Sequence, residues 1–218
     1  MAKLHLGCGQ NYLSGYLNID FPDSEHSVQK ISIADLQTNI LTLQYIQNSI
    51  DEIRLHHVFE HFTRPVAVAL IASWRSWLKP NAILRIEVPD FHRTAQVILS
   101  PFTTFKQKMT AERHIFGSHE ATWAVHCDGY TQQSLTELLK CYQFDIKNIT
   151  KNQWRGTYNI EIISQTKLQE INKEECKQIA KEFLSKFLID STKTEVNLLN
   201  VWLDLYDQQI EVSWGIHK

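Results

Sequence analysis

Short apolar runs alternate with longer stretches of helical periodicity along the chain, and this alternation is the feature that most restricts its fold. Strands that alternate with helices are typical of a mostly parallel sheet covered by helices. The length of 218 residues favours one α/β domain that carries an additional segment. We predict seven strands, at residues 3–6, 16–20, 29–34, 52–57, 82–88, 144–149 and 157–163.

Helical periodicity is clearest over residues 64–78, where Pro65 stands at a first-turn position. A second helix is predicted over residues 132–142, with Thr131 as its N-cap. Both helices follow a predicted strand, as an α/β fold requires.

Two further amphipathic helices are predicted after the last strand, at residues 172–188 and 195–206. Residues 90–130 carry no strand signal, and connections of that length are usually functional or lid-like. We therefore expect a domain at residues 1–167 with a lid insertion at about 90–130, followed by a C-terminal helical appendage at 168–218.

The charge and composition of the chain argue against some classes of binding partner. The formal net charge is −2 and no Lys/Arg stripe is clustered, which argues against a nucleic-acid partner. No apolar run approaches the roughly 20 residues that span a bilayer, and the first residues lack a signal-peptide pattern. The cysteines form no C-x-x-C pair, so we expect free thiols. A cytoplasmic protein with no membrane span is therefore expected.

The first predicted strand ends in Gly7–Cys8–Gly9. Glycine accepts positive φ and has no Cβ, so such a turn brings bare backbone close to a ligand, although a purely structural turn looks the same. The next strand ends in Asp20, where a carboxylate can accept hydrogen bonds from both hydroxyls of a ribose. The chain has neither a G-x-G-x-x-G run nor a phosphate-loop lysine, so adenosine without phosphates fits better.

Four segments occur in the order KLHLGCGQNYLSGYLNIDF, IADL, DEIRLHHVFEHF and WLKPNAILRIEVPDF. Together they resemble the successive motifs of class I S-adenosylmethionine-dependent methyltransferases over roughly residues 3–164. The resemblance is closest to small methyltransferases with Glu-His after the fourth strand and Pro-Asp after the fifth. It implies a Rossmann-like, doubly wound, mostly parallel sheet of seven strands whose last strand is antiparallel. It also implies S-adenosylmethionine as cofactor.

The resemblance implies cofactor contacts at the ends of four strands. They are Gly7, Cys8 and Gly9 beside the methionine part, Asp20 at the ribose, Asp35 and Leu36 at the adenine, and His56, His57 and Val58 at the mouth of the fourth strand. The sequence departs from the family in the short connection between Gly9 and Asp20, which leaves room for only a rudimentary helix.

Residues 57–61, HVFEH, also match the H-x-x-E-H motif of zinc peptidases. A zinc hydrolase using His57, Glu60 and His61 is therefore an alternative, and it requires a helix at this place. Residues 53–57 alternate as a strand instead, so the motif is expected to cross a strand-to-loop junction.

Further histidines and acids gather in the predicted lid, at Glu112, His114, His119, His126 and Asp128. They invite a metal hypothesis, but without ligand spacing we favour polar loop contacts and predict no metal site. A histidine can take the proton of a hydroxyl acceptor, and His57, His61 and His126 are the candidate catalytic bases.

The resemblance implies transfer of a methyl group from S-adenosylmethionine to a small-molecule or glycan acceptor, and the association of the resembling family with glycan assembly makes a sugar hydroxyl the leading candidate. Methyl transfer is an in-line displacement, so positioning of the acceptor would supply much of the rate. The alternative from another class is a cofactor-binding scaffold that has lost catalysis. The sequence leaves open a homodimer through the C-terminal helices.

Overall fold

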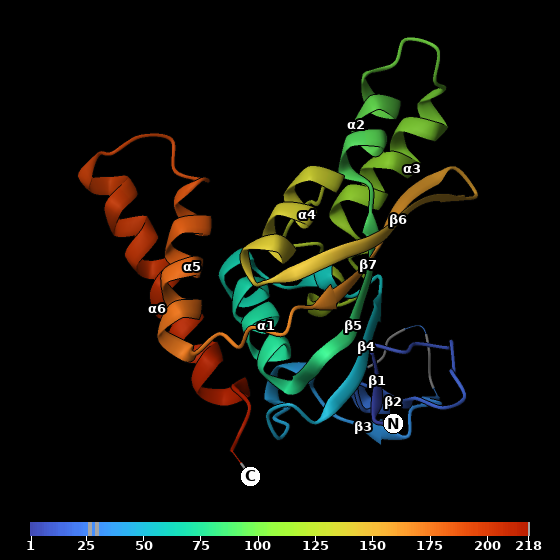
Figure 1. The fold of residues 1–218 in the computed structure, drawn as a ribbon. Helices are drawn as coiled ribbons and strands as arrows, with labels where there is room; N and C mark the ends of the chain where they lie inside the picture. The colour runs from blue at the N-terminus through green and yellow to red at the C-terminus, as the bar shows by residue number, and fades with distance from the viewer. Residues whose placement is uncertain (26–27, 29–30, 218) are drawn as a thin grey trace.

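The computed structural model describes residues 1–25, 28 and 31–217 of the chain. One sheet has the strand order β3-β2-β1-β4-β5-β7-β6 (Figure 1), in which the first five strands are parallel and β7 runs antiparallel to both β5 and β6. Its strands are β1 Lys3–Leu6, β2 Leu17–Asp20, β3 Leu36–Gln37, β4 Ile50–His56, β5 Leu78–Pro89, β6 Phe144–Trp154 and β7 Thr157–Thr166. The prediction of a seven-stranded, mostly parallel α/β sheet with an antiparallel last strand is confirmed.

The third strand is the one whose predicted position is wrong. Of the predicted residues 29–34, the first two lie outside the described residues and the other four form no strand. The strand forms at Leu36–Gln37 instead, after the Asp35 N–H donates a hydrogen bond to the carbonyl oxygen of Asn18 at 2.8 Å. Two residues are too few to show alternation, so a sequence pattern cannot locate this strand.

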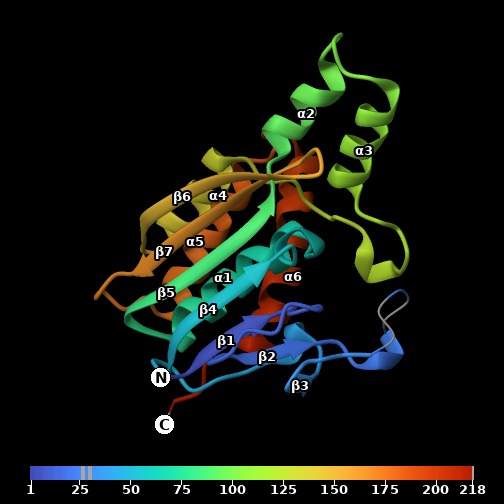
Figure 2. The ribbon, with the colours of Figure 1, turned by 90° about the vertical axis from the view of Figure 1, so that its right-hand side faces the viewer.

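Six α-helices are described: α1 Arg64–Trp77, α2 Phe91–Leu99, α3 Phe105–Phe116, α4 Gln132–Cys141, α5 Lys173–Ser185 and α6 Lys193–Ser213. The helices predicted from periodicity correspond to α1, α4, α5 and α6, and their existence is confirmed. The predicted N-cap is confirmed as well, because the Thr131 side chain accepts a hydrogen bond from the Ser134 N–H. In Figure 2 these four helices lie behind the sheet, so they cover one of its faces.

The stretch at 90–130 that carries no strand signal folds into a helical hairpin of α2 and α3, which projects beyond the sheet (Figures 1 and 2). Asp90 caps α2 and Thr104 caps α3, each by accepting a backbone N–H in the first turn. Gly117 follows α3 with φ of +92°, and a Cβ there would lie 2.2 Å from the Ala124 carbonyl oxygen. The chain can turn back toward the sheet at this position only with glycine.

Successive side chains of β4 and β5 point to opposite faces of the sheet, so these strands have one apolar face and one polar face. Ile53, Leu55, Leu84 and Ile86 are fully buried in the core beneath the helices. The intervening side chains are polar, at Glu52, Arg54, His56, Arg85 and Glu87. His56 and Glu87 are direct cross-strand partners, so alternation and register together bring an imidazole and a carboxylate side by side.

The C-terminal helices belong to the same core as the sheet. Leu199, Tyr206 and Ile210 of α6 are buried in the cluster that includes α1. The buried indole N–H of Trp77 in α1 donates to the carbonyl oxygen of Ser213 in α6 at 2.9 Å. Among the described residues, no helix is both long and apolar enough to cross a membrane, and all the cysteines are free thiols, as expected.

We expect the substitution Trp77→Phe to lower the free energy of unfolding by about 1–3 kcal/mol, because it leaves the buried Ser213 carbonyl oxygen without its donor. Equilibrium unfolding in urea, followed by circular dichroism, measures this loss. A matched control is Trp154→Phe, since Trp154 is exposed in β6 and should tolerate the change. Equal unfolding midpoints for both variants would contradict the role of this hydrogen bond.

Candidate functional site

The glycine turn and the acidic residue predicted from the sequence meet at the carboxyl ends of β1 and β2. Gly7 and Gly9 have φ of +66° and +53°, values that favour glycine. The Gly9 N–H donates to Asp20 Oδ2 at 2.5 Å, and the Phe21 N–H donates to Asp20 Oδ1 at 2.7 Å. We call Gly7, Cys8, Gly9 and Asp20 the glycine–aspartate notch.

The two glycines of the notch have different surroundings. A Cβ at Gly7 would lie 2.3 Å from a methyl carbon of Val58, so this glycine is required for the packing of β1 against the end of β4. A Cβ at Gly9 would meet nothing within 4 Å. Bare backbone at Gly9 therefore faces open space beside a carboxylate, which is the surface that a ligand can approach closely.

Other predicted cofactor contacts occupy different places. Cys8 is buried, and burial together with the charge of Asp20 raises the pKa of its thiol to about 11, so it stays neutral. Asp35 lies beside Asn18 rather than beside Asp20, and its carboxylate accepts hydrogen bonds from the Asn18 backbone N–H and side-chain amide at 2.8 and 3.0 Å. Leu36, the next residue, is exposed at the edge of the sheet. The structure thus places Asp35 directly before β3 and Leu36 at the start of β3, with the Asp35 carboxylate already hydrogen-bonded.

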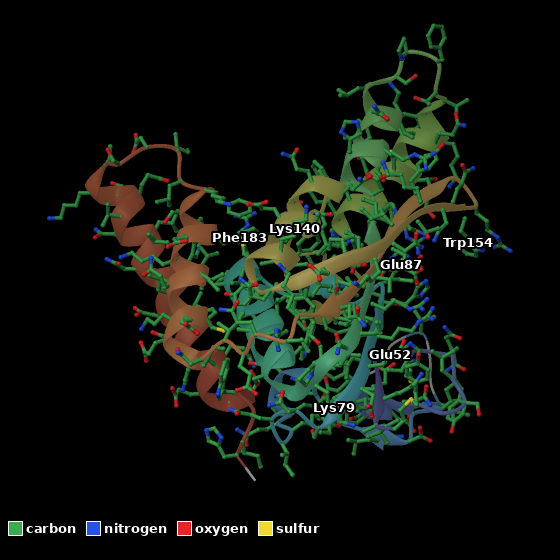
Figure 3. The ribbon with its side chains drawn as sticks, viewed as in Figure 1. Glu52, Lys79, Glu87, Lys140, Trp154 and Phe183 are labelled. Carbon is green, nitrogen blue, oxygen red and sulfur yellow. The ribbon has the colours of Figure 1, made fainter. Side chains whose placement is uncertain are left out.

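A pocket of about 1000 Å³ opens where β4 and β5 end. Its walls come from α3, the turn after α3, and the β6–β7 hairpin. Figure 3 shows Glu87 and Trp154 on the same side of the molecule, with Trp154 at the end of that hairpin. The polar lining includes His56, His57, His61, Glu87, His114, His126, Asn152 and Asn159. We call this the histidine pocket, and it contains all three histidines predicted as candidate bases.

Glu60 lies beneath this pocket with a side chain that is 1% exposed. Its Oε1 atom is 3.2 Å from His57 Nδ1 and 3.9 Å from His126 Nε2. Burial favours the protonated carboxyl, but the hydrogen bond with His57 and the charges of the nearby histidines together outweigh burial and hold the pKa of Glu60 below its ordinary value. A carboxylate is therefore held between two imidazoles.

The pKa values of His57 and His126 are shifted in opposite directions. Burial lowers the pKa of His57, but the hydrogen bond and charge of Glu60 and the charge of Glu87 together outweigh burial, so its pKa is raised. Burial lowers the pKa of His126, and the charge of Glu60 offsets this only partly. His61 Nδ1 hydrogen-bonds the Val125 carbonyl oxygen at 3.1 Å, so this nitrogen carries the proton. His126 is thus the candidate that is favoured in its neutral, proton-accepting form.

Glu87 is a member of the site that sequence reasoning missed. Its Oε1 atom lies 3.2 Å from His56 Nε2 and accepts a hydrogen bond from Asn152 Nδ2 at 3.1 Å. Burial would raise its pKa, but these hydrogen bonds and the charges of His56 and His57 together outweigh burial and lower the pKa to about 2. The alternation of β5 could have placed Glu87 beside His56, whereas nothing in the sequence indicates that Asn152 reaches it from the β6–β7 hairpin.

The histidines and acids predicted in the lid do not lie together in the structure. His114 and His126 line the pocket, whereas His119 hydrogen-bonds the nearby Phe116 carbonyl oxygen and Asp128 pairs with Arg64.

The geometry that a zinc peptidase motif requires is absent from residues 57–61, because β4 ends at residue 56 and a 3-10 turn occupies 59–61. These histidines do not stand one helical turn apart, so the helical requirement of that alternative is contradicted.

Comparison with known proteins bears on the fold. No family model matches the sequence, and a search of curated proteins finds no match. A methyltransferase from Methanosarcina mazei, described as dependent on S-adenosylmethionine, is 17% identical with a TM-score of 0.50 and covers 77% of this chain and 93% of its own. The 1,6-didemethyltoxoflavin N1-methyltransferase of Burkholderia thailandensis, solved with S-adenosylhomocysteine, is 11% identical with a TM-score of 0.51 and covers 76% and 71%. The fold of this chain is therefore the Rossmann-like fold of solved S-adenosylmethionine-dependent methyltransferases.

Proposed function

We propose that this protein transfers a methyl group from S-adenosylmethionine to a hydroxyl group of a polar acceptor, with a sugar or glycan as the leading candidate. The observation that carries the proposal is the glycine–aspartate notch, where open backbone at Gly9 adjoins the Asp20 carboxylate. The shared fold supports it, because ligands of open α/β sheets bind at the carboxyl ends of the strands.

The notch suits a nucleoside without phosphates. The Asp20 carboxylate accepts the backbone N–H groups of Gly9 and Phe21, and a carboxylate is the type of acceptor that ribose hydroxyls can bind. Gly7, Cys8, Gly9 and Val58 would lie beside the methionine part. When bound, S-adenosylmethionine supplies an electrophilic methyl carbon. An adenine contact by Asp35 and Leu36, and cofactor contacts by His56 and His57, stay predictions.

The histidine pocket suits an acceptor with several hydroxyl groups, because imidazoles, carboxylates and amides line it. Within it, we assign proton acceptance to His126, whose burial keeps the imidazole neutral near pH 7. Glu60, 3.9 Å from its Nε2 atom, would stabilise the imidazolium that forms. His61, whose ring centroid lies 4.7 Å from that of His126, would position this ring.

Calorimetric titration with S-adenosylmethionine tests the cofactor half of the proposal. We expect Asp20→Ala to weaken binding roughly 10- to 150-fold, since hydrogen bonds to a charged acceptor contribute about 1.5–3 kcal/mol. Asp145→Ala is the matched control, because Asp145 lies in β6, away from the notch, and forms a surface ion pair with Lys167. Thermal unfolding of each variant separates lost binding from lost folding.

No heat of binding with the wild-type chain, or equal affinity for wild type and Asp20→Ala, would contradict a cofactor at the notch. Turnover separates the enzyme from the scaffold alternative. Release of S-adenosylhomocysteine in the presence of hydroxylated acceptors supports the enzyme, whereas tight binding without release across a broad set of acceptors supports the scaffold.

A further inference from the structure

We propose that His56, His57 and Glu87 bind a divalent transition-metal ion at the floor of the histidine pocket. Their ligand atoms all lie within 4.8 Å of one another. His56 Nε2 is 3.2 Å and His57 Nε2 is 4.0 Å from Glu87 Oε1. Ligands at about 2.0–2.2 Å from a tetrahedral ion are separated by about 3.4 Å, so small side-chain rotations would complete the site.

The backbone at His57 is shaped so that two consecutive imidazoles reach one carboxylate. Consecutive side chains of a strand point to opposite faces, yet the ring centroids of His56 and His57 are 4.9 Å apart. The change of direction comes from His57, which has φ of +55°, and from its N–H, which donates to the Glu87 carbonyl oxygen at 2.9 Å. A histidine in this conformation is strained, and such strain is concentrated at functional sites.

Groups behind the ligands orient them as metal sites require. With Glu60 Oε1 3.2 Å from its Nδ1, His57 would carry a proton on Nδ1 and present the Nε2 lone pair toward Glu87. Asn152 fixes Glu87 by donating to the same oxygen that faces both histidines. A carboxylate behind a ligating histidine is the usual outer arrangement of a metal centre. The lone pair of His57 Nε2 and the carboxylate oxygen of Glu87 are both electron-rich and repel each other. A cation between them, either a proton or a metal ion, removes this repulsion.

The type of ion follows from the ligands. Two imidazoles and one carboxylate suit Zn²⁺, Fe²⁺ or Mn²⁺, and three protein ligands leave coordination positions open toward the pocket. A second group of Glu60, His61 and His126 also lies within 4.8 Å, but Glu60 Oε1 already hydrogen-bonds His57 Nδ1 and so serves to orient a ligand of the first group. A role of the ion in activating an acceptor would rest on the proposed function, whereas its binding does not.

The test is titration of the untagged, metal-stripped chain with Zn²⁺ and with Co²⁺, whose visible absorption reports its coordination, in competition with a chelator. We expect one ion per chain. Glu87→Gln removes a ligand charge and keeps the side-chain shape, and we expect it to weaken binding by at least about 100-fold, the upper range for loss of an outer-shell partner. His61→Asn is the matched control, because His61 belongs only to the second group. The metal affinity of this variant should equal that of the wild type.

Two results would overturn the proposal: no stoichiometric binding by the wild-type chain, or equal affinity in the wild type and Glu87→Gln. Loss of binding in His61→Asn together with the second result would place the ion at the second group. Circular dichroism and thermal unfolding show whether each variant is folded. Because these titrations contain no S-adenosylmethionine, their failure would leave the proposed methyl transfer intact, and a failed cofactor titration would leave the metal site intact.

Discussion

The substitution His126→Gln is expected to slow methyl transfer by about 10²–10⁴-fold, the range for loss of a general base, and to leave affinity for S-adenosylmethionine unchanged. The imidazole lines the histidine pocket, away from the notch residues, and is held near the buried Glu60 carboxylate. Glutamine can hydrogen-bond an acceptor hydroxyl but cannot accept its proton. Initial rates of S-adenosylhomocysteine release with a hydroxylated acceptor measure the effect.

The matched control is His119→Gln, since His119 hydrogen-bonds the Phe116 carbonyl oxygen in the turn after α3. Its rate should equal that of the wild type. Full turnover by His126→Gln would mean that no proton acceptance by this residue is needed, and would leave His57 and His61 as the remaining candidates.

The pH dependence of kcat/KM is an independent test of proton acceptance by His126. Proton acceptance requires the neutral imidazole, so activity should fall as pH falls through the pKa of His126. Burial lowers this pKa below the ordinary 6.5; Glu60 raises it, whereas His61, His114 and His57, when charged, lower it. The acidic limb should therefore have its midpoint below 6.5. A midpoint above 6.5 would point to His57, whose pKa is raised.

The substitution Phe59→Ala is expected to lower the free energy of unfolding by about 3–5 kcal/mol, because it empties a large site in the core. Phe59 is fully buried, and its ring centroid lies 5.0 Å from that of Tyr130 and 5.9 Å from that of Trp74. It precedes Glu60 directly, so the same packing supports the carboxylate beneath the pocket. Equilibrium unfolding in urea measures the loss.

Phe62→Ala provides the comparison, since Phe62 is only partly buried and packs at the edge of the same cluster. A smaller loss is expected there. If Phe62→Ala cost as much as Phe59→Ala, the turn would not depend on its buried aromatic residue in the way described.

The parts of the fold that the sequence predicts are those with a local signal. The ends of β1 and β2 follow from short apolar runs, and parallel pairing then brings Gly9 and Asp20 to one edge. The helices at 64–77 and 132–141 follow from a periodic apolar face and from their first-turn residues. For these elements, local preference and tertiary packing agree.

The parts that the sequence does not predict depend on distant contacts or lack a buried face. Helix α2 buries only Thr94 and α3 only Ala111, so neither adds an apolar face to the core, although the sequence of α2 is amphipathic. The left-handed backbone of His57 depends on Glu87 in another strand, and Asn152 arrives from a third. Such contacts form only when the strands are arranged in the sheet, so the spacing of residues along the sequence does not indicate them.

The notch and the histidine pocket are encoded by separate stretches of the chain. Residues 7–20 form the first, whereas the segment at 110–126 and the β6–β7 hairpin at 144–166 contribute most of the walls of the second. Val58, packed against Gly7 and adjacent to His57, is a point where they touch. On the proposed function, either of these two segments could therefore be exchanged to change which acceptor is preferred, with the glycine–aspartate notch left as it is.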